Sequence, residues 1–134
     1  VRGFIVKVRQ GTDGGQSWGP GAMLVWPDGG GIRAGTRSDG TLQSDVYGQQ
    51  THGGEYDTGK WVWLRARWLD RRGVIERSDN GQDWQRLWTF EHGGAGSGET
   101  ASLLVGKVPY NGEAADYGEP GSEGQCEIDF VRVY

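Results

Sequence analysis

The sequence predicts an all-β protein, a two-sheet antiparallel β-sandwich. Apolar and polar residues alternate over most of the chain, whereas the periodicity of an amphipathic helix is absent. Short turn-forming segments separate the alternating runs, as in sandwiches and barrels. Seven tryptophans and 26 glycines occur within 134 residues, which favours a rigid framework with tight turns and flat rings to bury or present.

The alternation predicts nine strands. In chain order they are Gly3–Arg9, Ala22–Trp26, Ile32–Arg37, Leu42–Tyr47, Trp61–Leu69, Val74–Ser78, Gln85–Phe90, Ser102–Val108 and Glu127–Tyr134. Four turns are expected to close hairpins, at Gly30-Gly31, Asp39-Gly40, Leu69–Gly73 and Ser78–Gly81. We expect residues 1–134 to be one domain, because this length suffices for a single core. We also expect this domain to be a module of a larger chain, tethered there to other domains.

The strand Trp61–Leu69 has two chemically different sides. Val62, Leu64, Ala66 and Trp68 share the side expected in the core, and Trp61, Trp63, Arg65 and Arg67 share the other. The second side could line a groove, or its rings could pack under a loop while the arginines stay in solvent. On Ile32–Arg37, Arg33 and Arg37 share one side with Gly35 between them, which leaves a flat patch for a ring to approach.

Composition argues against several classes of function. The net charge is −4, whereas nucleic-acid binding normally requires a basic face. No apolar run approaches the roughly 18 residues of a membrane span. Cys126 is the single cysteine and is expected to be a packed, unreactive residue, while His52 and His92 lack the spacing of a zinc site.

Two long loops are expected, from His92 to Thr100 and from Pro109 to Gly124. The first is almost entirely Gly, Ala and Ser, and the second contains Tyr110, Asn111 and Asp116. Loops of this length in a compact domain are often functional. The tyrosines and prolines of the second loop favour an ordered structure, and a disordered acidic loop is the alternative.

The segments Thr12–Trp18 and Ser78–Trp84 match each other closely. Both resemble a shortened Asp box, the hairpin motif of sialidase-type propellers. Its expected role is structural: the Asp accepts turn N–H groups, the Gly adopts positive φ, and the Trp anchors the loop on the sheet. A sialidase is excluded by length, because a propeller needs at least about four blades of four strands.

The strand near the C-terminus begins Glu127-Ile-Asp129-Phe130, which resembles half of the catalytic strand of laminarinase-type glycosidases. Retaining hydrolysis requires a second carboxylate, and Arg132 stands at the position expected for it. We therefore expect this protein not to be an enzyme.

Two segments carry a wider resemblance. Trp61–Trp84 resembles a recurrent piece of concanavalin A-like lectin and glucanase domains, and Ile128–Tyr134 resembles the last strand of many bacterial carbohydrate-binding jelly rolls. The resemblance implies a jelly-roll, concanavalin A-like sandwich that binds glycans on a concave face or edge loops, and an extracellular or cell-surface location. It also implies, as in some relatives, a structural Ca²⁺ with Asp129 as a ligand, the alternative being an edge-strand or turn-facing carboxylate.

Together these observations predict a non-catalytic module that binds a polysaccharide or glycan. The predicted ligand contacts are Trp61, Trp63, Arg33, Arg37, Tyr110, Asn111, Asp116 and Trp18. The site is expected where Trp61 and Trp63 meet the Ile32–Arg37 strand and the Pro109–Gly124 loop, because rings cover the apolar face of a sugar while polar groups bind its hydroxyls. An adhesion or protein-interaction sandwich without a sugar site is the alternative, and a hydrolase fragment is a third. Solvent exposure of Trp61, Trp63 or Trp18 would favour the glycan-binding module.

Overall fold

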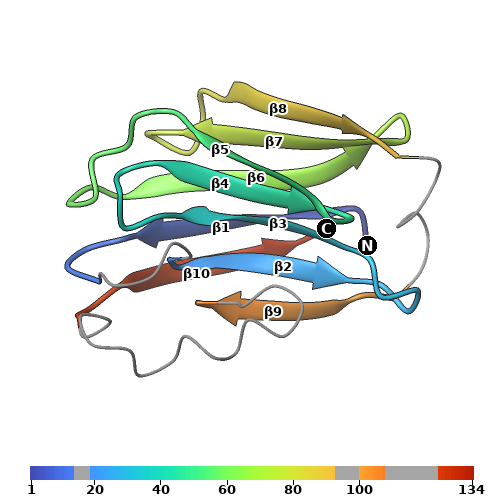
Figure 1. Cartoon of the computed structure of the whole chain (residues 1–134), viewed down its shortest axis with the longest axis horizontal. Coiled ribbons are helices and arrows are strands. Elements are labelled where there is room, and N and C mark those ends of the chain that lie inside the picture. The colour runs from blue at the N-terminus through green and yellow to red at the C-terminus, as the bar shows by residue number, and fades with distance from the viewer. Residues whose placement is uncertain (14–18, 93–99, 108–123) are drawn as a thin grey trace.

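The computed structural model describes residues 1–13, 19–92, 100–107 and 124–134 (Figure 1). These residues form ten strands and no helix: β1 (Gly3–Arg9), β2 (Gly21–Val25), β3 (Gly31–Thr36), β4 (Leu42–Val46), β5 (Gln49–Gly53), β6 (Val62–Leu69), β7 (Arg72–Ser78), β8 (Gln85–Glu91), β9 (Ser102–Gly106) and β10 (Glu127–Val133). Within the described part of the chain, no helix is long and apolar enough to cross a membrane.

The strands form two five-stranded sheets. Sheet A has the order β10-β1-β6-β7-β8, sheet B has the order β5-β4-β3-β2-β9, and all neighbouring strands are antiparallel. Sheet B lies in front of sheet A in Figure 1. The predicted two-sheet antiparallel β-sandwich is therefore confirmed.

The core fills the space between the sheets. Alternate residues of β1 and β6 supply the sheet A side, and the predicted core side of the Trp61–Leu69 strand is confirmed, since Val62, Leu64 and Ala66 are at most 1% exposed. Sheet B contributes Ala22, Leu24, Ile32, Ala34, Leu42 and Val46. Full burial of a large apolar side chain contributes about 1.5–3 kcal/mol, so these contacts are the main force that holds the sheets together.

An aromatic cluster closes one end of the core. Trp26, Tyr47, Trp68 and His92 come from different strands and turns, with ring centroids 4.1–6.4 Å apart. The Tyr47 hydroxyl donates to the Asp28 carboxylate at 3.1 Å, which ties the β2–β3 turn to the cluster.

Strand β5 was not predicted from the sequence. Tyr47 and Gly48 both have positive φ and form a tight turn that reverses the chain after β4. The strand that follows is polar and lies at the edge of sheet B, with its residues exposed or only partly buried. An edge strand that contributes no core side chain has no apolar alternation, so the pattern used to find the other strands is absent here.

Candidate functional site

The outer face of sheet A combines aromatic rings with cations. Trp61 and Trp63 are partly exposed, and the Lys7 ammonium lies 4.9 Å from the centroid of each ring. The Arg9 guanidinium carbon lies 4.9 Å from the Trp61 centroid. These distances are within the range of cation–π attraction, about 6 Å. The sheet therefore holds both rings in fixed positions at its surface.

Glu76 is the buried centre of the same face. Its carboxylate accepts hydrogen bonds from Arg65 Nε at 2.5 Å and from Arg67 Nε and Nη2 at 3.1 and 3.2 Å. Burial acts to raise the pKa of Glu76, but the hydrogen bonds and charges of the two arginines outweigh it, so this pKa lies below its ordinary value. Arg65 also stacks on Trp84, 4.2 Å from the ring centroid.

The β7–β8 hairpin supports this face. The Asn80 side-chain oxygen accepts from the backbone N–H groups of Gln82 and Asp83, each at 2.8 Å, and Ser78 Oγ accepts from Gly81 N at 2.9 Å. Gly81 has a φ of 78°. Positive φ at the glycine and anchoring by the tryptophan were predicted for this motif, but the N–H acceptors are Asn80 and Ser78. The Asp79 carboxylate instead pairs with Arg77 at 3.1 Å.

A polar hollow of about 390 Å³ lies beside Trp61, where the β5–β6 loop meets the end of β7. We call it the Trp61 pocket. Its walls are Tyr56, Asp57, Lys60, Trp61, Arg77 and Asp79. It therefore combines two aromatic rings, those of Tyr56 and Trp61, with two carboxylates, an ammonium and a guanidinium. Carboxylates accept hydrogen bonds, whereas the two cations donate them, so the pocket can satisfy a ligand that carries several hydroxyl groups.

The loop that builds this pocket is fixed by its own hydrogen bonds. The Asp57 carboxylate accepts from Gly59 N at 2.9 Å, and the Tyr56 hydroxyl donates to the Lys60 carbonyl at 2.6 Å. Gln10 N donates to the same hydroxyl at 3.1 Å, and Gly11 N donates to the Thr58 carbonyl at 2.8 Å. Burial raises the pKa of Tyr56, which keeps the phenol protonated and able to donate.

A second hollow, of about 330 Å³, lies on the other side of the same loop. Arg9, Gly11, Thr12, Thr58, Gly59, Gln125 and Glu127 line it. Arg9 also contacts the Trp61 ring, so this hollow adjoins the Trp61 pocket. The two hollows together extend the polar surface around one tryptophan.

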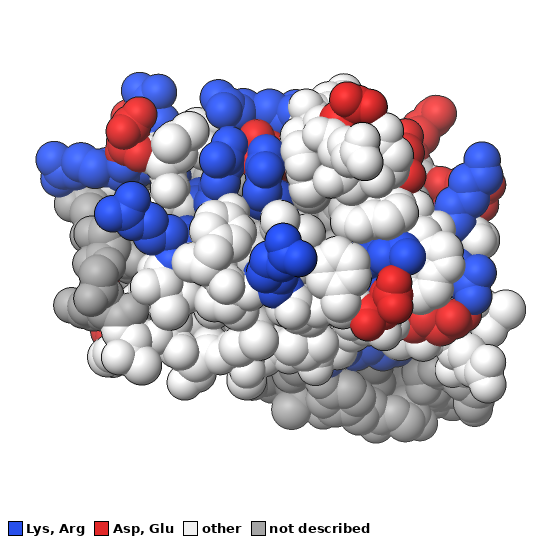
Figure 2. Space-filling model, turned by 180° about the vertical axis from the view of Figure 1, so that it is seen from behind, with Lys and Arg blue, Asp and Glu red and all other residues white. Residues whose placement is uncertain are grey.

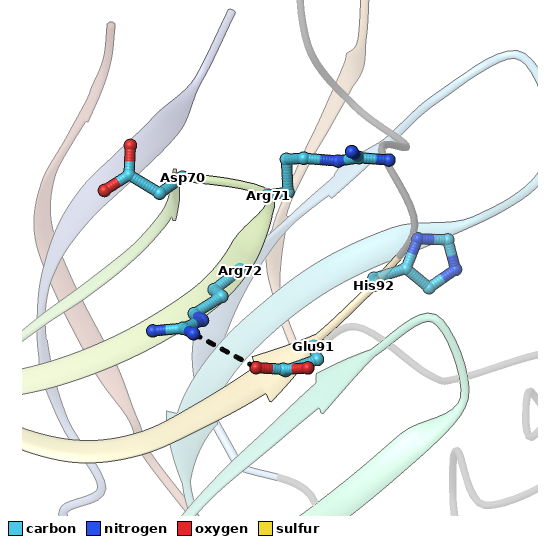
Figure 3. A pocket seen from close by; sticks show the side chains of 5 residues that line it. All are labelled: Asp70, Arg71, Arg72, Glu91 and His92. Carbon is cyan, nitrogen blue, oxygen red and sulfur yellow. Dashed lines mark ion pairs between the residues drawn. The ribbon is translucent and has the colours of Figure 1, made fainter.

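A third hollow, of about 330 Å³, lies near the aromatic end of the core and is lined by Asp70, Arg71, Arg72, Glu91 and His92 (Figure 3). Its one drawn ion pair joins Arg72 Nη2 to Glu91 Oε1 at 3.2 Å. The His92 ring packs against Tyr47, with centroids 4.1 Å apart and the ring planes tilted by 30°. His92 is therefore engaged in packing, and this hollow lacks a ring presented to a ligand.

The residues predicted to form one site do not all meet. Trp61 and Trp63 lie on the outer face of sheet A, while Arg33 points away from the core on sheet B, because its neighbours Ile32 and Ala34 are core residues. The expected contact between these tryptophans and the Ile32–Arg37 strand is therefore wrong.

The other predicted contact residues are buried, paired or outside the described part of the chain. Arg33 is fully buried, so the patch around Gly35 is not open. Arg37 is partly exposed and pairs with Asp39 at 3.5 Å. Trp18, Tyr110, Asn111 and Asp116 lie outside the described residues.

The carboxylates of β10 both have cationic partners. Asp129 accepts from Lys7 Nζ at 2.7 Å, and Glu127 pairs with Arg9. Among the residues that the structure describes, no group of three or more His, Cys, Asp or Glu side chains is placed to hold a metal ion. The described side chains around Asp129 thus do not fit a Ca²⁺ site by themselves, since a lysine ammonium stands beside the one carboxylate predicted as a ligand.

Several residues of the pocket were not identified from the sequence. Asp57, Lys60, Arg77 and Asp79 come from two loops and the end of a strand, separated by about twenty residues, and only the pairing of β6 with β7 brings them together. The Asp57-Thr-Gly59 turn was a signal that could have marked the first loop as ordered.

Comparison with known proteins supports the fold alone. No protein-family model and no curated protein matches this sequence. A solved structure of a functionally unknown protein from Saccharomyces cerevisiae is similar, with a TM-score of 0.51 and 20% identity over 78% of this chain. This chain spans 60% of the length of that protein. The structure of SCP-B, a member of the eqolisin family of peptidases, in complex with the tripeptide Ala-Ile-His gives a TM-score of 0.49 at 14% identity, covering 97% of this chain and 66% of that one.

Proposed function

We propose that this protein is a non-catalytic carbohydrate-binding module and that the Trp61 pocket holds the sugar. The observation that carries the proposal is the partly exposed indole of Trp61 in a hollow whose other walls are mostly charged. Such a combination suits a ligand with one apolar face and a rim of hydroxyl groups. A pyranose ring is such a ligand.

The chemistry of the walls supports this assignment. The indole would cover the C–H face of the sugar, while Asp57 and Asp79 would accept from its hydroxyls and Lys60 and Arg77 would donate to them. Arg77 is itself held by the Glu55 carbonyl at 2.8 Å and by Asp79 at 3.1 Å. Because these groups are ordered before binding, little conformational entropy would be lost.

The size of the hollow fits a short oligosaccharide segment. Its volume of about 390 Å³ is near the lower end of the range for small-molecule sites, roughly 300–1,000 Å³. We place the protein outside the cell or at its surface, as the resemblance to concanavalin A-like domains implies.

An interaction module without a sugar site is the competing proposal. Trp26 and Trp68 are buried in the core, but Trp61 and Trp63 are only partly buried on the outer face. Partial exposure of these two rings is the feature that favours glycan binding. Absence of catalysis is supported by Arg132 in place of the second carboxylate and by the pairing of Glu127 with Arg9.

The test begins with a glycan array and continues with isothermal titration of the best ligand. Replacing Trp61 with Ala should weaken binding by about 1–3 kcal/mol, roughly 5- to 150-fold, as loss of an aromatic anchor typically does. Trp63→Ala is the comparison variant: it removes another partly exposed ring of the same face that does not line the pocket, so it should weaken binding less than Trp61→Ala does. If Trp61→Ala folds and binds unchanged, the pocket is not the site. If wild type binds no glycan, the interaction module replaces this proposal.

A further inference from the structure

The outer face of sheet A has a surplus of positive charge on a chain whose net charge is −4. Its strands direct seven cations outward: Lys7, Arg9, Arg65, Arg67, Arg72, Arg86 and Arg132. They direct four carboxylates outward, on Glu76, Glu91, Glu127 and Asp129, which leaves three positive charges. Figure 2 views the molecule from this side, with Lys and Arg side chains spread across the face.

Carboxylates are already the partners of these cations. Lys7 binds Asp129, Arg9 binds Glu127, and two arginines share Glu76. The guanidinium group presents a planar fork of donors that matches a carboxylate. The chemistry of this face therefore suits further carboxylates, supplied by a ligand.

Two arginines remain available for such a ligand. Arg86 lies opposite Glu76 in the β7–β8 ladder, and Arg132 lies opposite Ile5 in the β1–β10 ladder. Both side chains are exposed, and neither forms an ion pair within the described part of the chain. They lie on opposite sides of the Glu76 cluster, so an extended ligand would have to cross the sheet to contact both.

Aromatic residues accompany these cations across the sheet. Phe130 is 39% and Tyr134 46% exposed, and Trp63 is partly exposed between them and the β7–β8 hairpin. The pKa of Tyr134 is raised, first by burial, while the charges of Arg65 and Arg67 act to lower it, so this ring lies near the Glu76 cluster. The face thus offers flat apolar surfaces among the charges that would bind a ligand's carboxylates.

We propose that the outer face of sheet A binds a polyuronate, a polysaccharide with a carboxylate on each sugar, across the line from Arg132 to Arg86. The proposal rests on the proposed function and gives it a substrate class, because Trp61 belongs both to this face and to the Trp61 pocket. A surplus of three positive charges on this face suits a polysaccharide chain of moderate negative charge density. Duplex nucleic acid, with a charge about every 1.7 Å, would meet strong repulsion from the rest of this acidic protein.

The test is titration of wild type with polygalacturonate and with fully methyl-esterified polygalacturonate at low salt. Both probes have the same backbone, but only the first has carboxylates. We expect binding of the first, weakening as salt rises, and at least tenfold weaker binding of the ester. The double variant Arg86→Gln/Arg132→Gln should bind polygalacturonate about two- to thirtyfold more weakly, since each of the two exposed ion pairs lost contributes about 0.2–1 kcal/mol.

Arg37→Gln is the control, because it removes one positive charge at the end of β3, the central strand of the other sheet. Equal affinity of the wild type for the two probes would overturn the inference. An equal loss of polygalacturonate affinity in Arg37→Gln and in the double variant would also overturn it. Tighter binding of heparin or single-stranded DNA than of polygalacturonate would also overturn it, as general attraction to polyanions. A neutral glycan bound at the Trp61 pocket without any polygalacturonate binding would overturn the inference alone and leave the proposed function standing.

Discussion

Replacing Glu76 with Gln should destabilise the fold, although it changes the side-chain volume very little. The Glu76 side chain is only 6% exposed, and three hydrogen bonds from Arg65 and Arg67 converge on it. An amide removes the negative charge and turns one acceptor atom into a donor that faces a guanidinium. Removing one partner of a fully buried ion pair costs about 3–5 kcal/mol. Because the two arginines are 18% and 27% exposed, water can partly solvate them, and we expect about 2–3 kcal/mol.

The assay is urea unfolding at pH 7, followed by tryptophan fluorescence, with Glu91→Gln as the control. Glu91 also pairs with an arginine, but its side chain is 80% exposed, so its loss should cost less than about 0.5 kcal/mol. The folded-state pKa of Glu76 is lowered, so its stabilisation is present above the ordinary value of 4.5 and is lost as pH falls through the lowered pKa. The difference between wild type and Glu76→Gln should therefore shrink in acid. Equal stability of Glu76→Gln and Glu91→Gln at pH 7 would refute this reasoning.

Two further predictions concern the β7–β8 hairpin and the metal. Gly81→Ala should cost about 1–2 kcal/mol, because φ is 78° and the new Cβ would lie 2.9 Å from Trp63 Nε1. Gly29→Ala, with a φ of 84° but no neighbouring atom within 4 Å, should cost less, and equal unfolding midpoints for the two variants would exclude a role for the Trp63 contact. Because the Lys7 ammonium already pairs with Asp129, added Ca²⁺ should leave the melting temperature unchanged, and a rise in Ca²⁺ that chelator reverses would instead support the Asp129 site that the sequence predicts.

The chemistry of single strands could be predicted from the sequence. Strand β6 shows why: the period-two alternation alone separates Val62, Leu64 and Ala66 from Trp63 and Arg65, and each set lies on the expected side. The turn at Ser78–Gly81 was also predictable, since Asn-Gly accommodates the positive φ that a tight hairpin needs. The backbone geometry of a turn and the burial of one face of a strand both depend on residues that are close together in the chain.

Which strand surfaces share a side of the molecule depended on the tertiary structure. The segments Trp61–Leu69 and Ile32–Arg37 both carry arginines beside a ring or a flat patch, and they were expected to form one site. They belong to different sheets, and the apolar faces of these sheets meet in the shared core. Alternation indicates that one side of a strand is buried without indicating which other strand lies beyond it. Their aromatic and cationic sides consequently point in opposite directions.

The sequence by itself determined the all-β fold, the core side of β6 and the turn at Asn80-Gly81, because these depend on residues close together in the chain. Only the tertiary structure decided that Asp57, Lys60 and Arg77 surround Trp61, and that Lys7 and Arg9 contact its ring. The pairing of β1 with β6 and of β6 with β7 brings these side chains together. Such contacts follow from strand order and register, which the packing of the whole core fixes.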